Sequence, residues 1–371
     1  MHASRGRRLG IVVGSGLGIL LVLAGVLYFT GTLEKGKDRW DLSRACKGTL
    51  DAGSVRAALG GQEVYAEDGT QTDSEAAPSG TPPLASCHMA VRGGRNSMEV
   101  EIRREARHGG VSQYLQRNAP AAQLTNVAPL GTWPGVLTAD QGLARSSLTL
   151  KCGSKKGEGL AVDARLAHPV GTSMETSEPV RTSFARATVK IAEAAAGEFG
   201  CAYRPGKLPA RVPADPRVHP VDLSAAGGTC RDLRPLAAAA GRSGVPRAWD
   251  SRAGSAAPVE DCVLATSDGQ RPGYRISSYY GSYADSFAKS PAMKHARGER
   301  GFDKKGTLAW ATARCPGTDV RALYTFSGIY DPSGGDIPVR HRARSFEFDA
   351  LKAYAAASAR RHGCTDLRTP G

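Results

Sequence analysis

Two matching stretches decide the fold of this chain: SSLTLKC at residues 146–152 and LAWATARC at residues 308–315. Each alternates apolar with small or polar residues and ends in a cysteine, a pattern typical of a strand with one buried face. A second strand-like run follows each of them, GLAVDARL at 159–166 and VRALYTFSGIY at 320–330. Because the same local order occurs twice, we predict a two-copy internal repeat rather than a solenoid.

A helix with the same ending completes each copy. Apolar residues fall at helical spacing in both, at Phe184, Ala187, Ile191 and Ala194 in the first helix and at Phe348, Leu351 and Ala355 in the second. Both helices are predicted to end at a Gly-Cys pair, Gly200-Cys201 and Gly363-Cys364, because glycine favours the left-handed backbone found after helices. Each of these cysteines follows the cysteine of its strand by 49 residues.

The two copies also open alike. CKGTLDAGSVRAALGG at 46–61 and CRDLRPLAAAAGRSG at 230–244 each begin with a cysteine and continue as a short helix that glycine stops. Asp51 is predicted to cap the first of these helices. A middle helix is expected in each copy, near 110–117 and near 283–289.

The cysteines are predicted to form disulfides, because their number is even and no C-x-x-C pair indicates zinc. They are Cys46, Cys87, Cys152, Cys201, Cys230, Cys262, Cys315 and Cys364. Four cysteines per copy allow three pairings. We favour first with second and third with fourth, because each bond then ties a helix end to a strand. Closing each loop removes on the order of 4 kcal/mol of denatured-state entropy.

The N-terminus is predicted to hold the chain at the cell membrane. Residues 10–30 contain no charge and span roughly 30 Å as a helix, the thickness of the hydrocarbon core. Arg5, Arg7 and Arg8 precede this segment, so residues 1–9 are expected in the cytoplasm and the bulk of the chain outside, as in a single-pass protein. A cleaved signal peptide is the alternative interpretation.

Three glycines of the apolar segment lie on one helix face, at Gly10, Gly14 and Gly18. This spacing resembles the small-residue motif through which membrane helices pair, and it suggests a homodimer. The alternative is that glycine is simply frequent in a chain that contains 45 of them.

The predicted fold class is α+β: an N-terminal transmembrane helix followed by two similar α/β repeats, each an antiparallel sheet with packed helices and two disulfides. A juxtamembrane linker at 31–45 leads to the first repeat at 46–201, and a Pro-rich linker at 202–229 leads to the second at 230–371. The net charge of +14 is uneven, because residues 46–201 are neutral whereas 202–371 have 26 basic and 16 acidic side chains.

The sequence contains no motif that indicates catalysis, a cofactor or a metal. Nucleophile elbows, phosphate loops and His-Glu-x-x-His pairs are absent, and the eight histidines are scattered. The string DPSGGD at 331–336 has too few acidic ligands for calcium and is interpreted as a turn. We therefore expect a protein without catalytic, cofactor-binding or metal-binding residues.

One region suggests an anionic ligand. Aromatic residues are followed closely by basic ones in the second repeat: Tyr279, Tyr280, Lys294, Arg297, Arg300, Lys304 and Lys305. Such a combination binds anionic polymers or single-stranded nucleic acid. The alternative is that the tyrosines are packed in the fold and the basic loop is merely solvated. Nucleic acid is the less favoured partner for an exported chain.

The cysteine placement resembles that of exported, lipoprotein-like envelope proteins of high-GC actinobacteria. The resemblance rests on the opening Cys-x-x-x-Leu, the Ala-rich helix that ends in Leu-Gly-Gly, and the C-terminal phrase AAASARRHGCTDL. The chain departs from the pattern in two places. It has no cysteine directly after the apolar segment, and His88-Met89 stand where a tryptophan often follows the second cysteine. The resemblance implies a compartment and a fold type, and no activity.

We therefore expect a membrane-tethered, non-catalytic envelope protein that acts as a binding or accessory module. Its partners are expected to be the membrane, an anionic envelope polymer or another envelope protein. The alternatives are an envelope enzyme whose site is assembled from sequence-distant residues, and a structural protein that pairs through its membrane helix.

Overall fold

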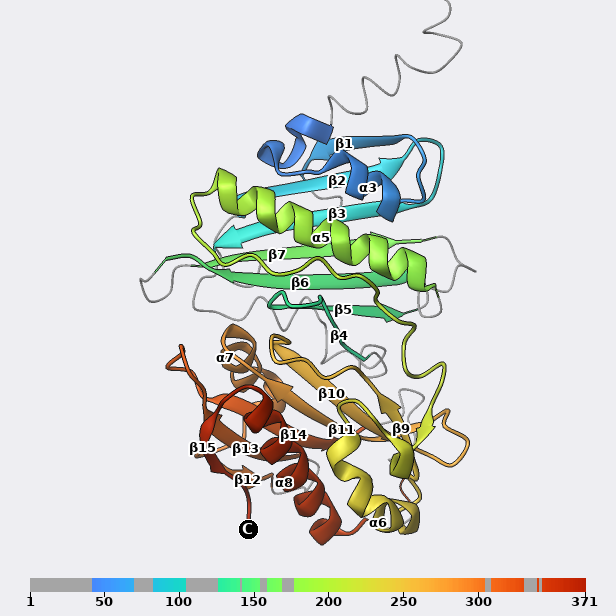
Figure 1. Ribbon diagram of the computed structural model, residues 1–371, viewed down its shortest axis with the longest axis vertical. Coiled ribbons are helices and arrows are strands. Elements are labelled where there is room, and N and C mark those ends of the chain that lie inside the picture. The colour runs from blue at the N-terminus through green and yellow to red at the C-terminus, as the bar shows by residue number, and fades with distance from the viewer. Residues whose placement is uncertain are drawn as a thin grey trace, which may run out of the picture.

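The computed structural model describes residues 42–69, 83–104, 126–140, 142–153, 159–168, 177–303, 308–329, 339 and 342–371. These residues form two antiparallel sheets that lie one beyond the other along the long axis (Figure 1). The long helix of each sheet, α5 (Glu178–Glu198) or α8 (Arg344–Arg361), packs on one face, whereas the short α7 (Ser282–Ala288) packs on the other face of the second sheet. We call the first sheet and its helices repeat 1, and the second sheet and its helices repeat 2.

Repeat 1 contains a seven-stranded sheet in the order β1-β2-β3-β7-β6-β5-β4. Its strands are β1 (Val64–Asp68), β2 (Ala85–Val91), β3 (Ser97–Arg104), β4 (Ala128–Pro129), β5 (Gly135–Asp140), β6 (Leu143–Lys151) and β7 (Gly159–Ala167). A 3-10 turn η1 (Ala45–Gly48) precedes the helices α3 (Ala52–Ala58) and α5 (Glu178–Glu198). The Asp51 side chain caps α3, as predicted, by accepting the N–H of Ser54 at 2.8 Å.

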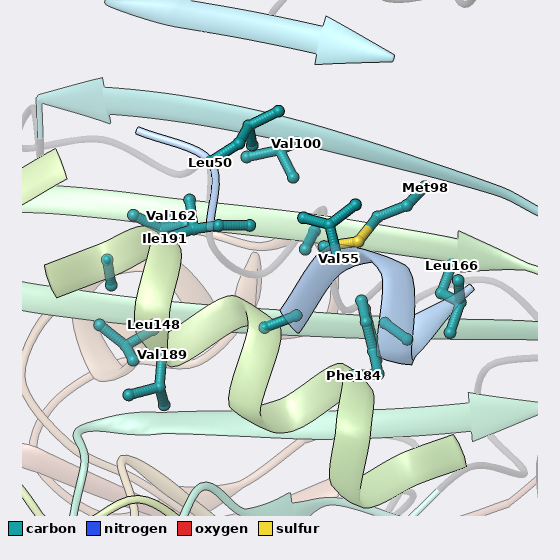
Figure 2. Close-up of a cluster of buried hydrophobic side chains, with 14 of the residues drawn as sticks. Leu50, Val55, Met98, Val100, Leu148, Val162, Leu166, Phe184, Val189 and Ile191 are labelled. Carbon is teal, nitrogen blue, oxygen red and sulfur yellow. The ribbon is translucent and has the colours of Figure 1, made fainter. Parts of the chain in front are cut away.

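The core of repeat 1 lies between the sheet and α5. Phe184 and Ile191 of α5 are fully buried, together with Val162 and Leu148 of the sheet (Figure 2). Val55 of α3 belongs to the same cluster. Burying side chains of this size stabilises a fold by about 1.5–3 kcal/mol each, so this face accounts for the position of α5.

Repeat 2 contains an eight-stranded sheet in the order β12-β13-β14-β11-β10-β9-β8, with β15 also paired to β13. Its strands are β8 (Val221–Asp222), β9 (Arg247–Asp250), β10 (Val259–Ala265), β11 (Pro272–Tyr279), β12 (Gly301–Phe302), β13 (Leu308–Arg314), β14 (Ala322–Gly328) and β15 (Thr365–Arg368). Its helices are η3 (Leu223–Ala225), η4 (Arg231–Leu236), α6 (Ala237–Arg242), α7 (Ser282–Ala288), η5 (Pro291–Met293) and α8 (Arg344–Arg361).

The two sheets share one strand order. The run β1-β2-β3-β7-β6-β5 of repeat 1 corresponds to β9-β10-β11-β14-β13-β12 of repeat 2. The register agrees as well, since Cys87 lies opposite Val100 and Cys262 lies opposite Ile276 at the matching positions. Residues of the two repeats can therefore be compared position by position.

Each repeat also holds its first cysteine with a carboxylate. Asp68 at the end of β1 accepts the N–H of Cys46, and Asp250 at the end of β9 accepts the N–H of Cys230, both at 2.8 Å. Each aspartate lies opposite the second cysteine of the same disulfide. The duplication therefore extends from strand order to individual hydrogen bonds.

The disulfides predicted from the sequence are present, in the favoured pairing: Cys46–Cys87, Cys152–Cys201, Cys230–Cys262 and Cys315–Cys364. The predicted helix ends are confirmed too. Gly200 and Gly363 both have φ of +65°, and the N–H of the following cysteine bonds back to the helix at 2.7 and 2.8 Å.

The predicted fold class is wrong. The described residues are dominated by two antiparallel sheets with few helices, not by α/β repeats behind a transmembrane helix. Among the described helices none is both long and apolar enough to cross a membrane, because the two longest, α5 and α8, bear charged residues along their length. The segment at 10–30 with its three aligned glycines, the tail at 1–9 and the middle helix near 110–117 lie outside the described residues.

The two repeats contact each other directly. Val127 and Val136 of repeat 1 join an apolar cluster with side chains of β10, β11, β13, β14 and α7. Tyr283 on α7 donates to the carbonyl oxygen of Ser147 at 3.0 Å, and the N–H of Val127 donates to Asp261 at 3.4 Å. The Pro-rich segment predicted as a linker packs along α5, and its last residues supply β8.

Candidate functional site

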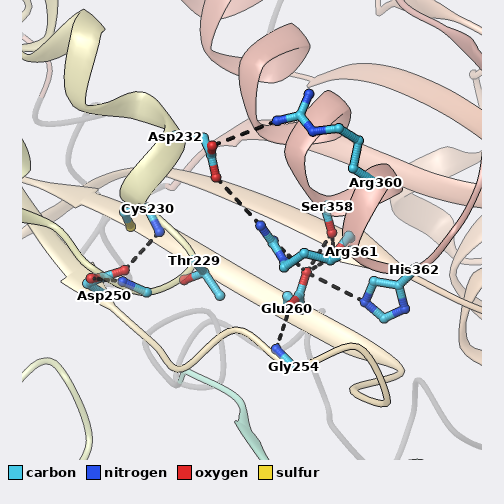
Figure 3. A network of polar contacts seen from close by, with 12 residues as sticks. Thr229, Cys230, Asp232, Asp250, Gly254, Glu260, Ser358, Arg360, Arg361 and His362 are labelled. Carbon is cyan, nitrogen blue, oxygen red and sulfur yellow. Dashed lines mark hydrogen bonds and ion pairs between the residues drawn. The ribbon is translucent and has the colours of Figure 1, made fainter.

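Repeat 2 contains a buried carboxylate under the C-terminal end of α8. Glu260 on β10 is 1% exposed. Its Oε1 accepts the N–H of Gly254 at 3.0 Å, and its Oε2 accepts the Ser358 hydroxyl at 2.5 Å and an Nη2 hydrogen of Arg361 at 3.0 Å (Figure 3). Burying a charge without such partners costs several kcal/mol. These contacts therefore offset the desolvation cost of the Glu260 carboxylate.

The contacts of Glu260 extend to the surface. Arg361 also lies 3.5 Å from Asp232 on η4, and Arg360 reaches the same carboxylate at 4.0 Å (Figure 3). The His362 ring lies 3.8 Å from Glu260 and stacks on Tyr280 with 3.7 Å between centroids. Arg360 is largely exposed, so the group forms a path from the core of repeat 2 to solvent.

Tyrosines surround the buried carboxylate. The Tyr280 hydroxyl donates to Ser358 at 2.6 Å, and the Tyr354 hydroxyl donates to the carbonyl of Glu260 at 2.9 Å. Burial raises the pKa of Tyr280 and of Tyr354 far above the usual value, and it raises the pKa of Tyr324 to about 12. Burial also lowers the pKa of His362, which favours the neutral imidazole. We call Glu260, Ser278, Tyr280, Tyr324, Tyr354, Ser358, Arg361 and His362 the Glu260 network.

Five positions of repeat 1 that correspond to the Glu260 network have apolar side chains. Aligned on the disulfides and the sheet register, the equivalents of Glu260, Ser278, Tyr324, Tyr354 and Ser358 are Ala85, Ile102, Val162, Ile191 and Ala195. All five residues of repeat 1 are buried and apolar. The shared fold can therefore pack apolar side chains at this position, where repeat 2 has charged and hydroxyl groups instead.

A second polar group enters the core of repeat 2 at the other end of α8. Glu347 is 6% exposed, accepts the Tyr274 hydroxyl at 3.0 Å and pairs with Arg342 at 3.0 Å. Its equivalents in repeat 1 are apolar as well, since Phe184 corresponds to Glu347 and Met98 to Tyr274. The polar substitutions thus lie at both ends of one helix.

The geometry of the Glu260 network suits the positioning of side chains better than nucleophilic catalysis. Ser358 is fully buried, and its hydroxyl donates to a carboxylate rather than to a histidine. The His362 ring stacks on Tyr280 instead of facing that hydroxyl. A nucleophile needs an adjacent base and access to a substrate, and Ser358 has a base but no access. Within the described ranges no group of residues has the make-up of a metal site.

The structure separates the residues predicted to form an anionic-ligand patch. Tyr279 is 4% exposed and stacks on Phe287 in the cluster between the repeats. Tyr280 belongs to the Glu260 network. Lys294, Arg297 and Arg300 are exposed on the loop after α7, and Lys304 and Lys305 lie outside the described residues. The tyrosines and the basic residues are therefore not one surface.

Repeat 1 has its own buried carboxylate, on the opposite face of its sheet. Asp163 is 2% exposed, and burial raises its pKa to about 7 against the effect of a hydrogen bond from Ser147. Glu101 lies directly opposite on β3, and burial raises the pKa of this residue too. Tyr283 of repeat 2 donates to Ser147, so Asp163 lies one residue from the contact between the repeats.

Sequence reasoning missed the Glu260 network, although a signal for it exists. Glu260 precedes Cys262 by two residues, so both side chains lie on the same face of β10. A disulfide cysteine that reaches a helix marks the core face, and a glutamate on that face is exceptional. Comparison with Ala85, two residues before Cys87, would have identified the substitution.

Comparisons with known proteins give no relative: no protein-family model, no curated protein and no solved structure has a significant match to this chain. Its function is therefore best sought in the geometry of its own residues.

Proposed function

We propose that this is an exported, non-catalytic binding or accessory protein of the cell envelope, in which repeat 1 is the scaffold and repeat 2 binds the ligand. The observation that supports it is the exchange of an apolar core in repeat 1 for the Glu260 network in repeat 2. Replacing hydrocarbon by a buried ion pair rarely adds stability, so the network is better explained by a role at the surface to which it leads.

That role is preorganisation. Glu260 fixes Arg361, and the Tyr280–His362 stack is fixed by Ser358 and by the end of α8. A binding group held in one position by buried partners loses less conformational entropy when a ligand arrives. Arg361, with Arg360 beside it, is therefore the proposed contact of this site with a ligand.

The four disulfides support a location outside the cytoplasm, where thiols are oxidised. Attachment at the cell membrane stays a prediction, because residues 10–30 lie outside the described residues.

The test is sedimentation of the full chain with insoluble envelope fragments of the producing cell, washed with detergent to remove lipid. The variant Glu260→Ala with Ser358→Ala copies the residues of repeat 1. We expect it to keep the near-UV circular dichroism of the folded protein and to lose at least tenfold in binding. Glu198→Ala, at the repeat 1 position equivalent to Arg361, is the matched control and should bind like the wild type. Unchanged binding by the double variant would refute the proposal.

An envelope enzyme is the second candidate, because Glu260, Ser358 and His362 come together from distant parts of the sequence. The enzyme would be favoured if the protein hydrolyses ester or glycoside substrates and if Ser358→Ala abolishes this hydrolysis but keeps envelope binding. Binding lost without any change in turnover would favour the binding protein.

A further inference from the structure

A second cluster of charges is centred on Asp366 of β15. Asp366 is contacted by Arg321 at 3.0 Å, Arg314 at 3.3 Å and Arg368 at 2.7 Å. Arg321 and Arg368 also reach Glu299, at 3.4 and 3.9 Å. The hydrogen bond from Arg321 lowers the pKa of Asp366, which therefore stays ionised.

Three arginines of this cluster pair with two carboxylates, and two of the three arginines are largely exposed. The Arg314 side chain is 72% exposed and that of Arg368 is 54% exposed. Arg300, next to Glu299, donates to the carbonyl of Thr369 at 3.1 Å and is exposed. Ion pairs this exposed contribute little to stability, so a structural role does not account for the excess of arginines.

The two clusters are joined by one short stretch of chain, residues 360–368. Arg360 and Arg361 end α8, and Arg368 ends the strand that follows, with the Cys315–Cys364 disulfide between them. Lys151 of repeat 1 reaches the same region by donating to the carbonyl of Gly317 at 2.6 Å. We call Arg300, Arg314, Arg321, Arg360, Arg361 and Arg368 the arginine belt. The carboxylates that pair with its members include Asp232, Glu260, Glu299 and Asp366.

The described residues of repeat 1 at the matching positions are mostly not basic. Aligned on the Cys152–Cys201 disulfide, Gly197 and Glu198 correspond to Arg360 and Arg361, and Pro205 corresponds to Arg368. Of the equivalents of the four belt residues that flank the disulfide, only Lys151, in place of Arg314, is basic. The fold shared by the two repeats therefore does not require basic residues at these positions, just as it does not require the Glu260 network.

We propose that the arginine belt binds a linear envelope polymer with repeated phosphate or carboxylate groups. This inference rests on the proposed function in taking repeat 2 as the binding repeat, and it adds the class of ligand. Several guanidinium groups on α8, β13 and β15 offer separate contacts for spaced anionic groups, whereas a single small anion would use only one or two of them. Nucleic acid is disfavoured because neither tyrosine predicted as a stacking platform is available: Tyr279 is buried and Tyr280 is covered by His362.

The test measures binding of the full chain to fluorescein-labelled polyphosphate and poly-L-glutamate by fluorescence anisotropy at several salt concentrations. Dextran serves as the uncharged control and a single-stranded oligonucleotide of matched charge as the nucleic-acid control. We expect Arg314→Glu with Arg368→Glu to weaken polymer binding at least tenfold and to reduce the slope of log affinity against log salt by about 2. Binding of polyphosphate alone would assign phosphate as the recognised group, and binding of both polymers would assign spaced negative charge.

The matched control is Arg92→Glu with Arg95→Glu, on the exposed hairpin between β2 and β3 of repeat 1, which should change affinity less than twofold. If the charge reversal disturbs the fold, Arg314→Gln with Arg368→Gln tests the same surface without new repulsion. Three results would overturn the inference. They are an affinity within twofold of the wild type in both repeat 2 variants, no binding of either polymer, or oligonucleotide binding equal to that of the polymers. Envelope sedimentation that still depends on Glu260 would then leave the proposed function standing.

Discussion

Removing Arg361 leaves the buried Glu260 carboxylate without its ion-pair partner, so we expect repeat 2 to become less stable. Their charged atoms are 3.0 Å apart, which corresponds to an attraction of about 6 kcal/mol at an effective dielectric constant of 20. In Arg361→Met the Ser358 hydroxyl and the Gly254 N–H still donate to the carboxylate. We therefore expect the free energy of unfolding to fall by an amount near the lower limit for a broken buried pair, about 3 kcal/mol. For a repeat of this size that lowers the melting temperature by roughly 6–12 °C.

Removing Glu260 instead of Arg361 should lower the free energy of unfolding by a smaller amount. In Glu260→Ala the remaining Arg361 side chain is 25% exposed and keeps Asp232 as a partner, so we expect a loss of about 1 kcal/mol. Replacing both residues removes the buried charge together with its partner, and the double variant should also lose only about 1 kcal/mol. The sum of the single losses then exceeds the loss in the double variant by about 3 kcal/mol, which is the coupling energy of the pair.

The assay is urea unfolding followed by pulsed hydrogen exchange and mass spectrometry, because peptides of β11 and α8 report on repeat 2 separately from repeat 1. Glu198→Met, at the position equivalent to Arg361 in repeat 1, is an exposed control and should lie within about 0.5 kcal/mol of the wild type. The reasoning is refuted if Arg361→Met costs less than 1 kcal/mol or if the two single losses add up in the double variant.

Three further changes test other parts of the structure. Because the pKa of Asp163 is raised in the folded state, the folded protein binds this proton more tightly than the unfolded chain does. The free energy of unfolding of the wild type should therefore fall as the pH rises from about 4 to 7. The total decrease is at most on the order of 4 kcal/mol. Asp163→Asn should remove this slope and be the more stable protein at pH 8; parallel pH profiles in denaturant titrations would contradict the prediction. Replacing Cys315 and Cys364 with serine opens a loop with a sequence separation of 49 and should cost about 4 kcal/mol in urea titrations, and a cost below 1 kcal/mol would count against an entropic role. Gly228→Ala places a methyl group against the carbonyl oxygen of Ser251, closer than van der Waals contact allows, and should cost about 3 kcal/mol; an unchanged melting temperature would show that the backbone adapts.

The local elements near the cysteines could be predicted because short-range rules determine them. Alternating residues predicted the strands that lead into Cys152 and Cys315, and these are observed as β6 and β13. The glycines before Cys201 and Cys364 marked both helix ends. Strand order could not be predicted in this way, because β3 pairs with β7 and β11 with β14 across long loops, and such pairing depends on tertiary packing.

The sequence does not show that the two adjacent tyrosines lie on different surfaces. Tyr279 and Tyr280 point to opposite faces at the end of β11, one toward repeat 1 and the other toward α8. The arginine belt also escaped notice, since Arg314 and Arg368 are far apart in sequence and meet only because β15 pairs with β13. Only the internal repeat offered a way to recognise such positions from sequence alone.

Hydrogen–deuterium exchange of the full chain, with and without soluble envelope fragments, tests most directly whether repeat 2 is the binding part of the protein. We expect slower exchange in peptides that cover 358–368 and η4. Peptides at the matching end of repeat 1, around 195–201, should exchange at the same rate with and without the fragments. Protection in repeat 1 alone, or equal protection of the two disulfide ends, would contradict the division into a scaffold repeat and a binding repeat.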